Sequence, residues 1–224
     1  MAQAFWAFFA QNACAEQKSK QPIRLKPLVC LFAFAFLSVT APIHAQDGDY
    51  ASVVEKERRE KDRQFRRGKE SPVPAGERRK FKGLAYFAVD TAFRVQAKLV
   101  RDTAQQPFAM KTTTARRPMY RKYGELHFTL KGQALKLAVY QSLDLMRNPL
   151  YHNYLFVPFT DTTTGDTTYG AGRYLDLRIP AADTVTLDFN RAYHPYCAYN
   201  PDYSCPVTPA ENRLPLAVEA GERL

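Results

Sequence analysis

The sequence predicts a mainly β protein, an antiparallel sandwich or a small split barrel, with a helix before it. Beyond residue 83 apolar residues recur at every second position, in short runs separated by turn-forming residues. No helical pattern of about 12 residues lies between these runs, which disfavours a parallel α/β sheet. Before residue 76 the chain is instead rich in charge and sparse in apolar residues, a pattern typical of a solvent-facing helix.

Residues 1–45 have the pattern of a targeting segment. Four basic residues precede an acid-free apolar run from Leu28 to Val39, and Ala41-Pro-Ile-His-Ala45 offers a small-residue cleavage site. We expect a mature chain that starts at Gln46 and is exported, to the periplasm or the extracellular side, free or associated with the envelope. A retained anchor is the alternative, but the apolar run is short for a bilayer span, so we expect no transmembrane anchor in the mature form.

Residues 46–76 are predicted to form a basic helical lead-in and a linker. The formal charge of +10 is concentrated here, because residues 56–82 carry 12 basic and 5 acidic side chains. Nucleic-acid binding would require aromatic residues interleaved with the charges, or a known module, and the segment has neither. We therefore expect no nucleic-acid partner, and a helix that ends at Ser71-Pro-Val-Pro-Ala-Gly76.

Residues 77–224 are predicted to be one β domain. Its first strand, residues 92–100, places Phe93, Val95, Ala97 and Leu99 on one face, with charged or polar residues between them. Residues 125–130 and 134–140 form a predicted hairpin around Lys131-Gly132-Gln133. Further strands are expected at residues 154–159, 173–179, 184–189 and 214–219.

Three glycines, Gly165, Gly170 and Gly172, precede the predicted strand at 173–179. A phosphate-binding loop would need a helix N-terminus after them, and a strand follows instead. The glycines are therefore expected to form a bulge or a tight bend.

Cys197 and Cys205 are the two cysteines that remain after removal of the targeting segment. In an exported protein an isolated pair in a proline-rich loop is most simply a disulfide. A zinc site that adds His194 and His152 is the alternative, but the spacing matches no zinc pattern, so we expect no metal.

A series of motifs is similar to the bacterial family called domain of unknown function 1684, over about residues 80–224. The motifs are Arg116-Arg117 with Tyr120, Tyr154–Asp161, Thr168–Tyr174, Leu187–Tyr193, Cys197-Ala-Tyr199, Cys205-Pro206 and Glu211–Pro215. The chain departs from the family pattern at Ala171, where glycine is usual, and at His194-Pro-Tyr196, where Asn-Pro-Pro is usual. The resemblance implies no particular activity and no cofactor, because the family has no settled function.

The motifs supply the candidate site residues, for which two interpretations remain open. In the first, arginines form an anion clamp, since a guanidinium group matches a carboxylate or phosphate, and tyrosine rings form a platform beside it. In the second, the arginines form ion pairs with neighbouring acids and amides. The candidates are Arg173, Arg191 and Arg213 first, then Arg116, Arg117, Tyr174, Asp188, Asn190, Tyr193, Glu211 and Asn212.

The sequence thus predicts binding of a small anionic or polar molecule near the C-terminal loops. Asp188 and His194 are the one acid and imidazole that lie close in sequence, and no hydrolase motif accompanies them. The alternatives are an uncharacterised enzyme, either hydrolase-like or a flavin-type split barrel, and a scaffold that binds another envelope protein.

Overall fold

The computed structural model describes residues 44–102 and 104–224, with side chains from Asp49 onward. Of the predicted targeting segment only His44 and Ala45 fall within these residues, and the apolar run lies outside them. Within the described part of the chain, no helix combines the length and the apolar character needed to cross a membrane.

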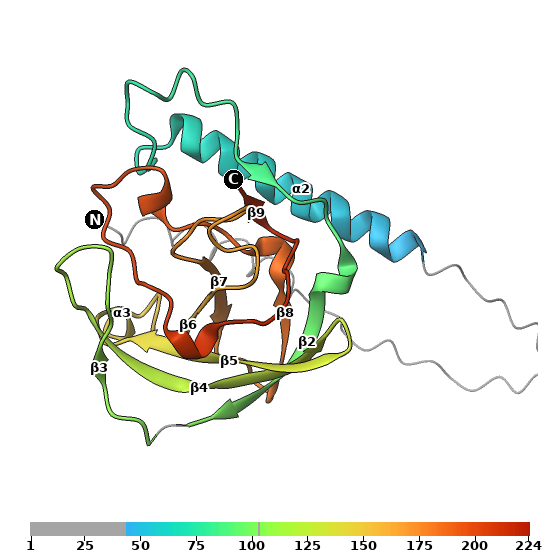
Figure 1. Cartoon of the computed structure of the whole chain (residues 1–224), viewed down its shortest axis with the longest axis vertical. Helices are drawn as coiled ribbons and strands as arrows, with labels where there is room; N and C mark the ends of the chain where they lie inside the picture. The colour runs from blue at the N-terminus through green and yellow to red at the C-terminus, as the bar shows by residue number, and fades with distance from the viewer. Residues whose placement is uncertain (1–43, 103) are drawn as a thin grey trace, which may run out of the picture.

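One curled antiparallel sheet forms most of the domain and has the shape of a half barrel (Figure 1). In spatial order its strands are β7 (Arg173–Arg178), β6 (Tyr154–Phe159), β5 (Gln133–Ser142), β4 (Met119–Leu130), β2 (Arg94–Arg101) and β8 (Thr184–Asp188), with β3 (Phe108–Ala109) paired to β4. A separate two-stranded sheet joins β1 (Ala85–Tyr86) to β9 (Glu222–Arg223). The predicted mainly antiparallel β fold with an N-terminal helix is confirmed.

Short helical segments connect these strands. They are η1 (Thr91–Phe93), α3 (Leu143–Met146), η2 (Phe189–Arg191), η3 (Tyr196–Ala198) and η4 (Ala210–Asn212). Side-chain caps hold three of them: Asp90 caps η1, Ser142 caps α3 and Asp188 caps η2, each by accepting a hydrogen bond from a backbone N–H of the turn.

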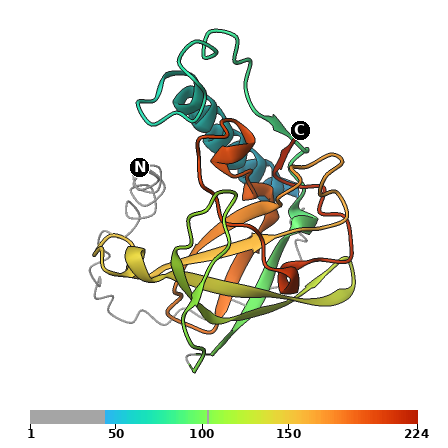
Figure 2. The same cartoon turned by 60° about the vertical axis from the view of Figure 1, so that its left-hand side comes forward.

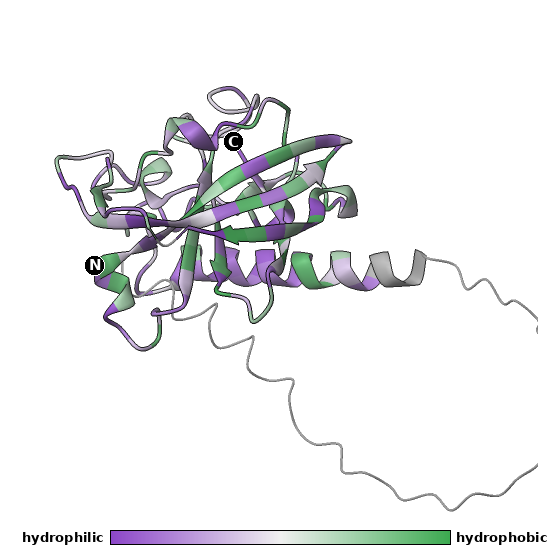
Figure 3. Ribbon diagram, turned by 90° about the horizontal axis from the view of Figure 1, so that it is seen from below, coloured by the Kyte–Doolittle hydropathy of each residue, from purple (hydrophilic) through white to green (hydrophobic). Residues whose placement is uncertain are grey.

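The predicted hairpin is strands β4 and β5. Leu130 pairs with Gln133, so the turn is the two residues Lys131 and Gly132, whose φ angles are 48° and 76°. Two central residues with positive φ are what a tight hairpin between right-twisted strands requires. Both strands extend beyond the predicted limits. Figure 3 shows that hydrophilic and hydrophobic residues are interspersed along the strands of the domain.

A bulge in β4 changes which face of the sheet its residues occupy. The register shifts between Lys122 and Gly124, and a Cβ at Gly124 would lie 2.3 Å from the carbonyl oxygen of Val100. Glycine is therefore required there. Because of the shift, Tyr120 and Leu126 pack in different clusters although an even number of positions separates them.

The sheet buries both faces, and each face has its own cluster. The main core lies within the curl and includes Leu126, Leu137, Val157 and Phe189. The second, here called the aromatic cluster, consists of Met110, Tyr120, Ala138, Tyr140, Tyr151, Tyr154, Phe156 and Tyr174. A bridge between Tyr174 and Tyr193, with backbone bonds of 2.9 and 3.1 Å, brings β7 against the segment after β8 and partly closes the curl.

Helix α2 (His44–Arg67) packs on the C-terminal segments, so the prediction of a solvent-facing lead-in is wrong (Figures 1 and 2). Val54 and Phe65 are almost completely buried, and Phe65 packs edge-on against the rings of Tyr196 and Tyr199. The sparse apolar positions of the helix are the ones that face the domain. Its many charges obscured this narrow stripe in the sequence.

The prediction of a strand at residues 214–219 is also wrong. Leu214, Leu216, Val218 and Ala220 are buried in the main core and alternate with more exposed residues, as in a strand. The segment makes backbone bonds to Thr160 and Thr162 but joins no continuous ladder. Alternation in sequence therefore indicated an extended, half-buried chain without indicating a pairing partner.

Candidate functional site

A cavity of about 430 Å³ lies on the aromatic face of strands β4 to β7, beside the C-terminal loops. Its lining residues are Arg116, Tyr120, Ser142, Asp144, Leu145, Arg147, Tyr154, Phe156, Tyr174, Tyr193, Pro195, Tyr196, Tyr203, Ser204, Cys205 and Pro206. A hollow of about 530 Å³ over β2, β4 and β8 contains none of the predicted candidate residues. The tyrosine-lined cavity is therefore the candidate site.

Aromatic rings that contact one another build the wall of the cavity. The centroids of Tyr120 and Phe156 are 6.0 Å apart, those of Phe156 and Tyr174 are 4.8 Å apart, and those of Tyr174 and Tyr193 are 5.8 Å apart. The last two pairs meet edge to face, the geometry that aromatic quadrupoles favour. Tyr120, Phe156 and Tyr174 come from paired strands, and a backbone bridge joins Tyr193 to Tyr174, so the rings hold each other in place.

Tyrosine hydroxyl groups in this wall are held by the protein. Tyr154 and Tyr193 both donate to Oδ1 of Asp176, at 2.6 and 2.9 Å, and Tyr174 donates to the carbonyl oxygen of Pro206. Burial raises the pKa of Asp176 to about 7, although the two hydroxyls, Lys61 and Arg178 oppose that rise. Asp176 therefore lies behind the cavity wall with a proton affinity suited to neutral pH.

Two exposed arginines, Arg116 and Arg147, line the cavity together with the carboxylate of Asp144. In the described part of the chain, neither guanidinium group has an ion-pair or hydrogen-bond partner. The positive charge of Arg116 lowers the pKa of Tyr120, while burial raises it more, to about 12. The rim thus offers two arginine side chains beside an aromatic wall.

Arg173, the first candidate from the sequence, lies outside the cavity with its side chain 1% exposed. Its Nη2 donates to Asp161 Oδ2 at 3.1 Å and to the carbonyl of Val218 at 2.6 Å, and its Nη1 donates to the carbonyls of Ala220 and Glu222. Burial lowers the pKa of Arg173, and Asp161 opposes that shift. The residue ties β7 to the last turn of the chain.

The Gly-rich segment before Arg173 forms a tight bend, as predicted. Gly165 and Gly172 have φ angles of 87° and 93°. A Cβ at Gly172 would lie 2.5 Å from the carbonyl oxygen of Phe159, so only glycine fits. The bend determines where β7 begins, and it directs the Arg173 side chain into the interior.

Arg191, Arg213 and Arg117 do not line the cavity either. Arg191 forms a two-bond ion pair with Glu57 of helix α2, at 2.9 and 3.0 Å, and lies 3.4 Å from Asp188. Arg213 is exposed beside its backbone bridge to Thr160, and Arg117 donates to the carbonyls of Thr114 and Arg116. Of the five predicted arginines, Arg116 is the one at the cavity.

Asp188 and Asn190 connect loops to each other. Asp188 accepts hydrogen bonds from the Tyr50 hydroxyl, at 2.8 Å to either oxygen, and from the backbone N–H of Asn190. The Asn190 side chain accepts a hydrogen bond from the Asp90 N–H at 2.9 Å and donates one to the Asp90 carbonyl at 2.8 Å. These residues anchor helix α2 and strand β8, away from the cavity.

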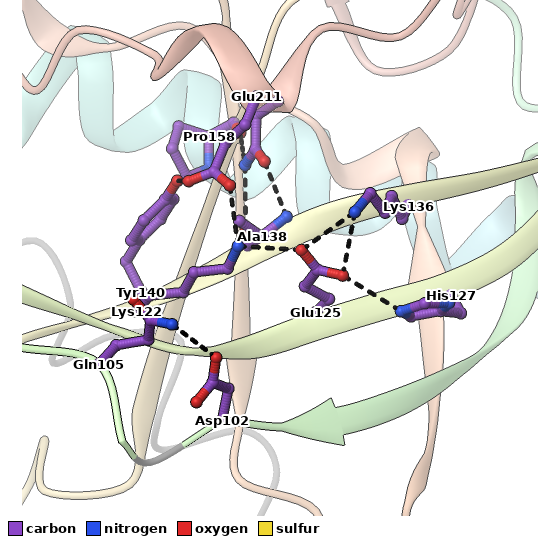
Figure 4. A network of polar contacts seen from close by, with 11 residues as sticks. Asp102, Gln105, Lys122, Glu125, His127, Lys136, Ala138, Tyr140, Pro158 and Glu211 are labelled. Carbon is purple, nitrogen blue, oxygen red and sulfur yellow. Dashed lines mark hydrogen bonds and ion pairs between the residues drawn. The ribbon is translucent and has the colours of Figure 1, made fainter.

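Glu211 and Asn212 belong to a polar network on the β4–β5 hairpin, outside the lining of the cavity; Figure 4 shows Glu211 with its partners. Lys122 bridges Glu125 and Glu211 at 2.9 and 2.8 Å, and the Tyr140 hydroxyl donates to Glu211 at 2.6 Å. Asn212 is fully buried and bonds the backbone of Ala138 and Pro158. The ion-pair interpretation predicted arginine partners for Glu211 and Asn212. Among the described residues their side chains instead contact Lys122, Tyr140 and backbone groups.

Cys197 and Cys205 are free thiols, so the predicted disulfide is not formed in this structure. The backbone N–H of Cys197 donates to the Cys205 sulfur at 3.3 Å, and the Tyr169 hydroxyl donates to the Cys197 sulfur at 3.7 Å. The described residues include no group of three or more potential metal ligands, so the zinc alternative with His152 and His194 gains no support.

His194 lies against Glu222 and not against Asp188. The carboxylate of Glu222 pairs with Lys61 at 2.6 Å and accepts from the His194 backbone N–H and the Tyr199 hydroxyl. Burial lowers the pKa of His194 to about 4, although Glu222 opposes the shift. The imidazole is therefore neutral at physiological pH, and it accepts from the Tyr169 backbone N–H through Nε2.

Three of the predicted candidates, Arg116, Tyr174 and Tyr193, line the cavity. Tyr174 and Tyr193 were predicted as a platform, whereas Asp176 and Arg147 were not singled out. An acid between two leucines of a predicted strand was the available signal for Asp176. Arg147 follows α3 in an exposed turn, and nothing in its local sequence distinguished it from other surface arginines.

Comparison with known proteins identifies a family and related solved structures. The sequence model of a family described as "Protein of unknown function (DUF1684)" matches residues 79–223. A solution NMR structure of an uncharacterized protein from Haloarcula marismortui is 37% identical, with a TM-score of 0.61, over 81% of this chain and 98% of that one. The structural match is longer than residues 79–223, so it includes part of the segment before them. No curated protein matches the chain.

Proposed function

This chain belongs to the DUF1684 family of proteins of unknown function, and we propose that it binds a small anionic molecule with a flat, apolar body in the tyrosine-lined cavity. The observation that carries the proposal is the pairing of an aromatic wall with two arginines, Arg116 and Arg147, that lack protein partners among the described residues. The volume of about 430 Å³ is within the usual range for small-molecule sites.

The chemistry of the lining defines the ligand class. A guanidinium group binds carboxylate and phosphate through parallel N–H bonds, and both arginines are exposed at the rim. The wall offers ring surface while the hydroxyls of Tyr154, Tyr174 and Tyr193 are engaged by Asp176 and Pro206. A ligand with a planar body and one carboxylate or phosphate group matches both parts.

The proposal includes export, which the sequence before Gln46 supports. Basic residues, an apolar run and a small-residue site follow each other in the order of a secretory signal. The cavity residues all lie after residue 115, so removal of residues 1–45 leaves the proposed site intact.

A thermal-shift screen of aromatic carboxylates and phosphate monoesters, followed by calorimetry on any compound that stabilises the protein, tests the binding function. We expect Arg116→Ala to weaken a hit by about 10- to 150-fold, because one charge-assisted pair contributes about 1.5–3 kcal/mol. Arg147→Ala is expected to act in the same direction.

Arg117→Ala is the matched control, because Arg117 is adjacent in sequence, carries the same charge and does not line the cavity. The Arg117→Ala variant should bind the compound found in the screen with the same affinity as the parent protein. Equal losses in the Arg116 and Arg117 variants would indicate general electrostatic attraction and contradict a specific site. Stabilisation by cations or neutral aromatics alone would contradict the ligand class.

A further inference from the structure

We propose that Cys197 and Cys205 form a redox-active dithiol beside the cavity, in which hydrogen peroxide oxidises Cys197 and Cys205 then closes a disulfide that thiol reductants reopen. Neither the family description nor the related structure assigns a role to either residue. The dithiol chemistry stands independently of the ligand. Its effect on binding, argued below, rests on the proposed function.

Backbone contacts hold the two cysteines together. Cys205 is fixed against the segment at residue 113 by two bonds, from Thr113 N–H to its carbonyl at 2.8 Å and from its own N–H to Thr113 Oγ1 at 3.1 Å. Cys197 lies in the short helix η3, and its N–H points at the Cys205 sulfur at 3.3 Å. The loop between them therefore begins and ends at fixed points, with the backbone of Cys197 against the sulfur of Cys205.

The two sulfurs have different environments, which assigns their roles. Cys197 is partly exposed and its sulfur accepts a hydrogen bond from the Tyr169 hydroxyl, whereas Cys205 is buried. The Cys205 thiol is the main cause that lowers the pKa of Cys197 to about 6, against the effect of burial. The same interaction raises the pKa of Cys205. The exposure of Cys197 and its hydrogen bond from Tyr169 make it the attacking cysteine, and buried Cys205 is the resolving one.

The reaction balances with hydrogen peroxide as the oxidant. The Cys197 thiolate attacks one oxygen, the O–O bond breaks, and the departing hydroxide takes a proton to become water, which leaves Cys197 as a sulfenic acid. The Cys205 sulfur, on losing its proton, attacks the Cys197 sulfur, the S–O bond breaks, and a second water leaves. Each sulfur loses one electron, and peroxide gains two.

Formation of the bond would reshape the cavity, because the same loop supplies part of its wall. Tyr203, Ser204 and Cys205 line the cavity and lie within or at the end of the loop, and Tyr196, which also lines it, directly precedes Cys197. A disulfide requires the two sulfurs to approach to about 2.05 Å, and the two cysteines are not bonded in this structure. The shift moves wall residues, so the oxidised protein should bind a cavity ligand with altered affinity.

The test uses the full-length protein, with thiols mapped by peptide mass spectrometry so that Cys14 and Cys30 are counted separately. One equivalent of hydrogen peroxide should join Cys197 to Cys205 with loss of two hydrogens, and dithiothreitol should restore both thiols in the folded protein. Cys205→Ser should stop at a sulfenic acid on Cys197 that a 1,3-diketone reagent traps, whereas Cys197→Ser should leave Cys205 unmodified.

Tyr169→Phe is the finer variant, since it removes one hydrogen bond to the Cys197 sulfur and should slow the first step severalfold without changing the product. Equal peroxide reactivity of Cys197 and Cys205, or persistence of both thiols in the folded protein, would overturn the proposal. Thiol mapping needs no ligand, so it tests the dithiol even if the ligand screen finds no compound that binds. Unchanged ligand affinity after oxidation would remove only the effect on the cavity.

Discussion

At the scale of single residues, the charged groups divide into those that the protein has already paired and those that it leaves at the cavity. Arg173 is enclosed by Asp161 and three backbone carbonyls, and Arg191 is paired with Glu57. Arg116 and Arg147 remain at the rim. The structure therefore supports the ion-pair interpretation for Arg173 and Arg191, and it leaves Arg116 exposed at the cavity.

Arg173→Ala is expected to destabilise the protein by about 3–5 kcal/mol, because it leaves the buried Asp161 carboxylate without its ion-pair partner. Urea unfolding followed by tyrosine fluorescence or circular dichroism measures the effect. Arg191→Ala is the control: its ion pair is half-exposed, so the loss should stay below about 1 kcal/mol. An Arg173→Ala protein as stable as the parent would contradict a structural role.

Asp176→Asn should change how stability depends on pH. The ordinary pKa of 3.8 rises to about 7 in the folded protein, so between these values the folded state holds a proton that the unfolded state has released. The resulting stabilisation is complete below the unfolded value and is lost as pH rises through the folded value. Asparagine stays neutral and still accepts from Tyr154 and Tyr193.

The variant should therefore gain stability relative to the parent as pH increases from 5 to 8. Thermal unfolding of both proteins across this range measures the difference. His194, whose low pKa produces the opposite trend, is present in both proteins, so its contribution cancels in the comparison. A difference that stays constant with pH would show that Asp176 titrates near its ordinary value.

At the scale of elements, helix α2 is part of the fold and not an appendage. Lys61 pairs with buried Glu222, Tyr50 bonds Asp188, and Arg58 donates to the carbonyls of Phe87 and Asn190. These contacts reach the first and last segments of the β domain. The match to the Haloarcula marismortui structure, which extends before residue 79, agrees with a helix that belongs to the domain.

A chain that starts at Gln46 should unfold at the same temperature as the full-length protein, since the side-chain contacts described for α2 begin at Tyr50. A chain that starts at Ser71 should be strongly destabilised, because it loses buried Phe65 and exposes the partners of Lys61 and Tyr50. Replacing a single buried phenylalanine such as Phe65 by alanine commonly lowers the free energy of unfolding by about 3–5 kcal/mol.

Thermal unfolding of the two truncated chains tests the helix, and N-terminal sequencing of the native protein tests cleavage before Gln46. If the Ser71 chain matches the full-length protein, the helix contributes nothing to stability. An intact N-terminus on protein recovered from the cytosol would contradict export.

At the scale of the whole molecule, contacts distant in sequence join the two ends of the domain. Strand β1 pairs with β9, and Tyr174 bridges to Tyr193 across the edge of the curled sheet. These pairings satisfy backbone N–H and C=O groups of edge strands that could otherwise pair with another chain. The cavity lies beside this closure, and so do Cys205 and Pro206, which places the candidate site where the two edges of the sheet approach each other.

Local patterns determined much of the fold. Alternating apolar residues predicted β2 and β5, and Lys131-Gly132-Gln133 predicted the hairpin turn, which the structure narrows to Lys131 and Gly132. The limits predicted for the strand at 154–159 are those of β6. These features depend on neighbours within a few positions, where backbone geometry and one-sided burial act directly on sequence. The motif series also identified the family.

The tertiary structure decided which side chains meet. Arg173 and Arg116 are both arginines in motifs, yet the bend at Gly172 directs one into the interior, and the loop before β4 leaves the other at the cavity. Likewise, the stripe of α2 that contains Val54 and Phe65 became a buried face only because a C-terminal surface was present to cover it. The sequence alone determines local conformation and the chemistry each residue offers. Which side chains contact each other depends on the packing of segments that are distant in sequence, and no local pattern encodes that packing.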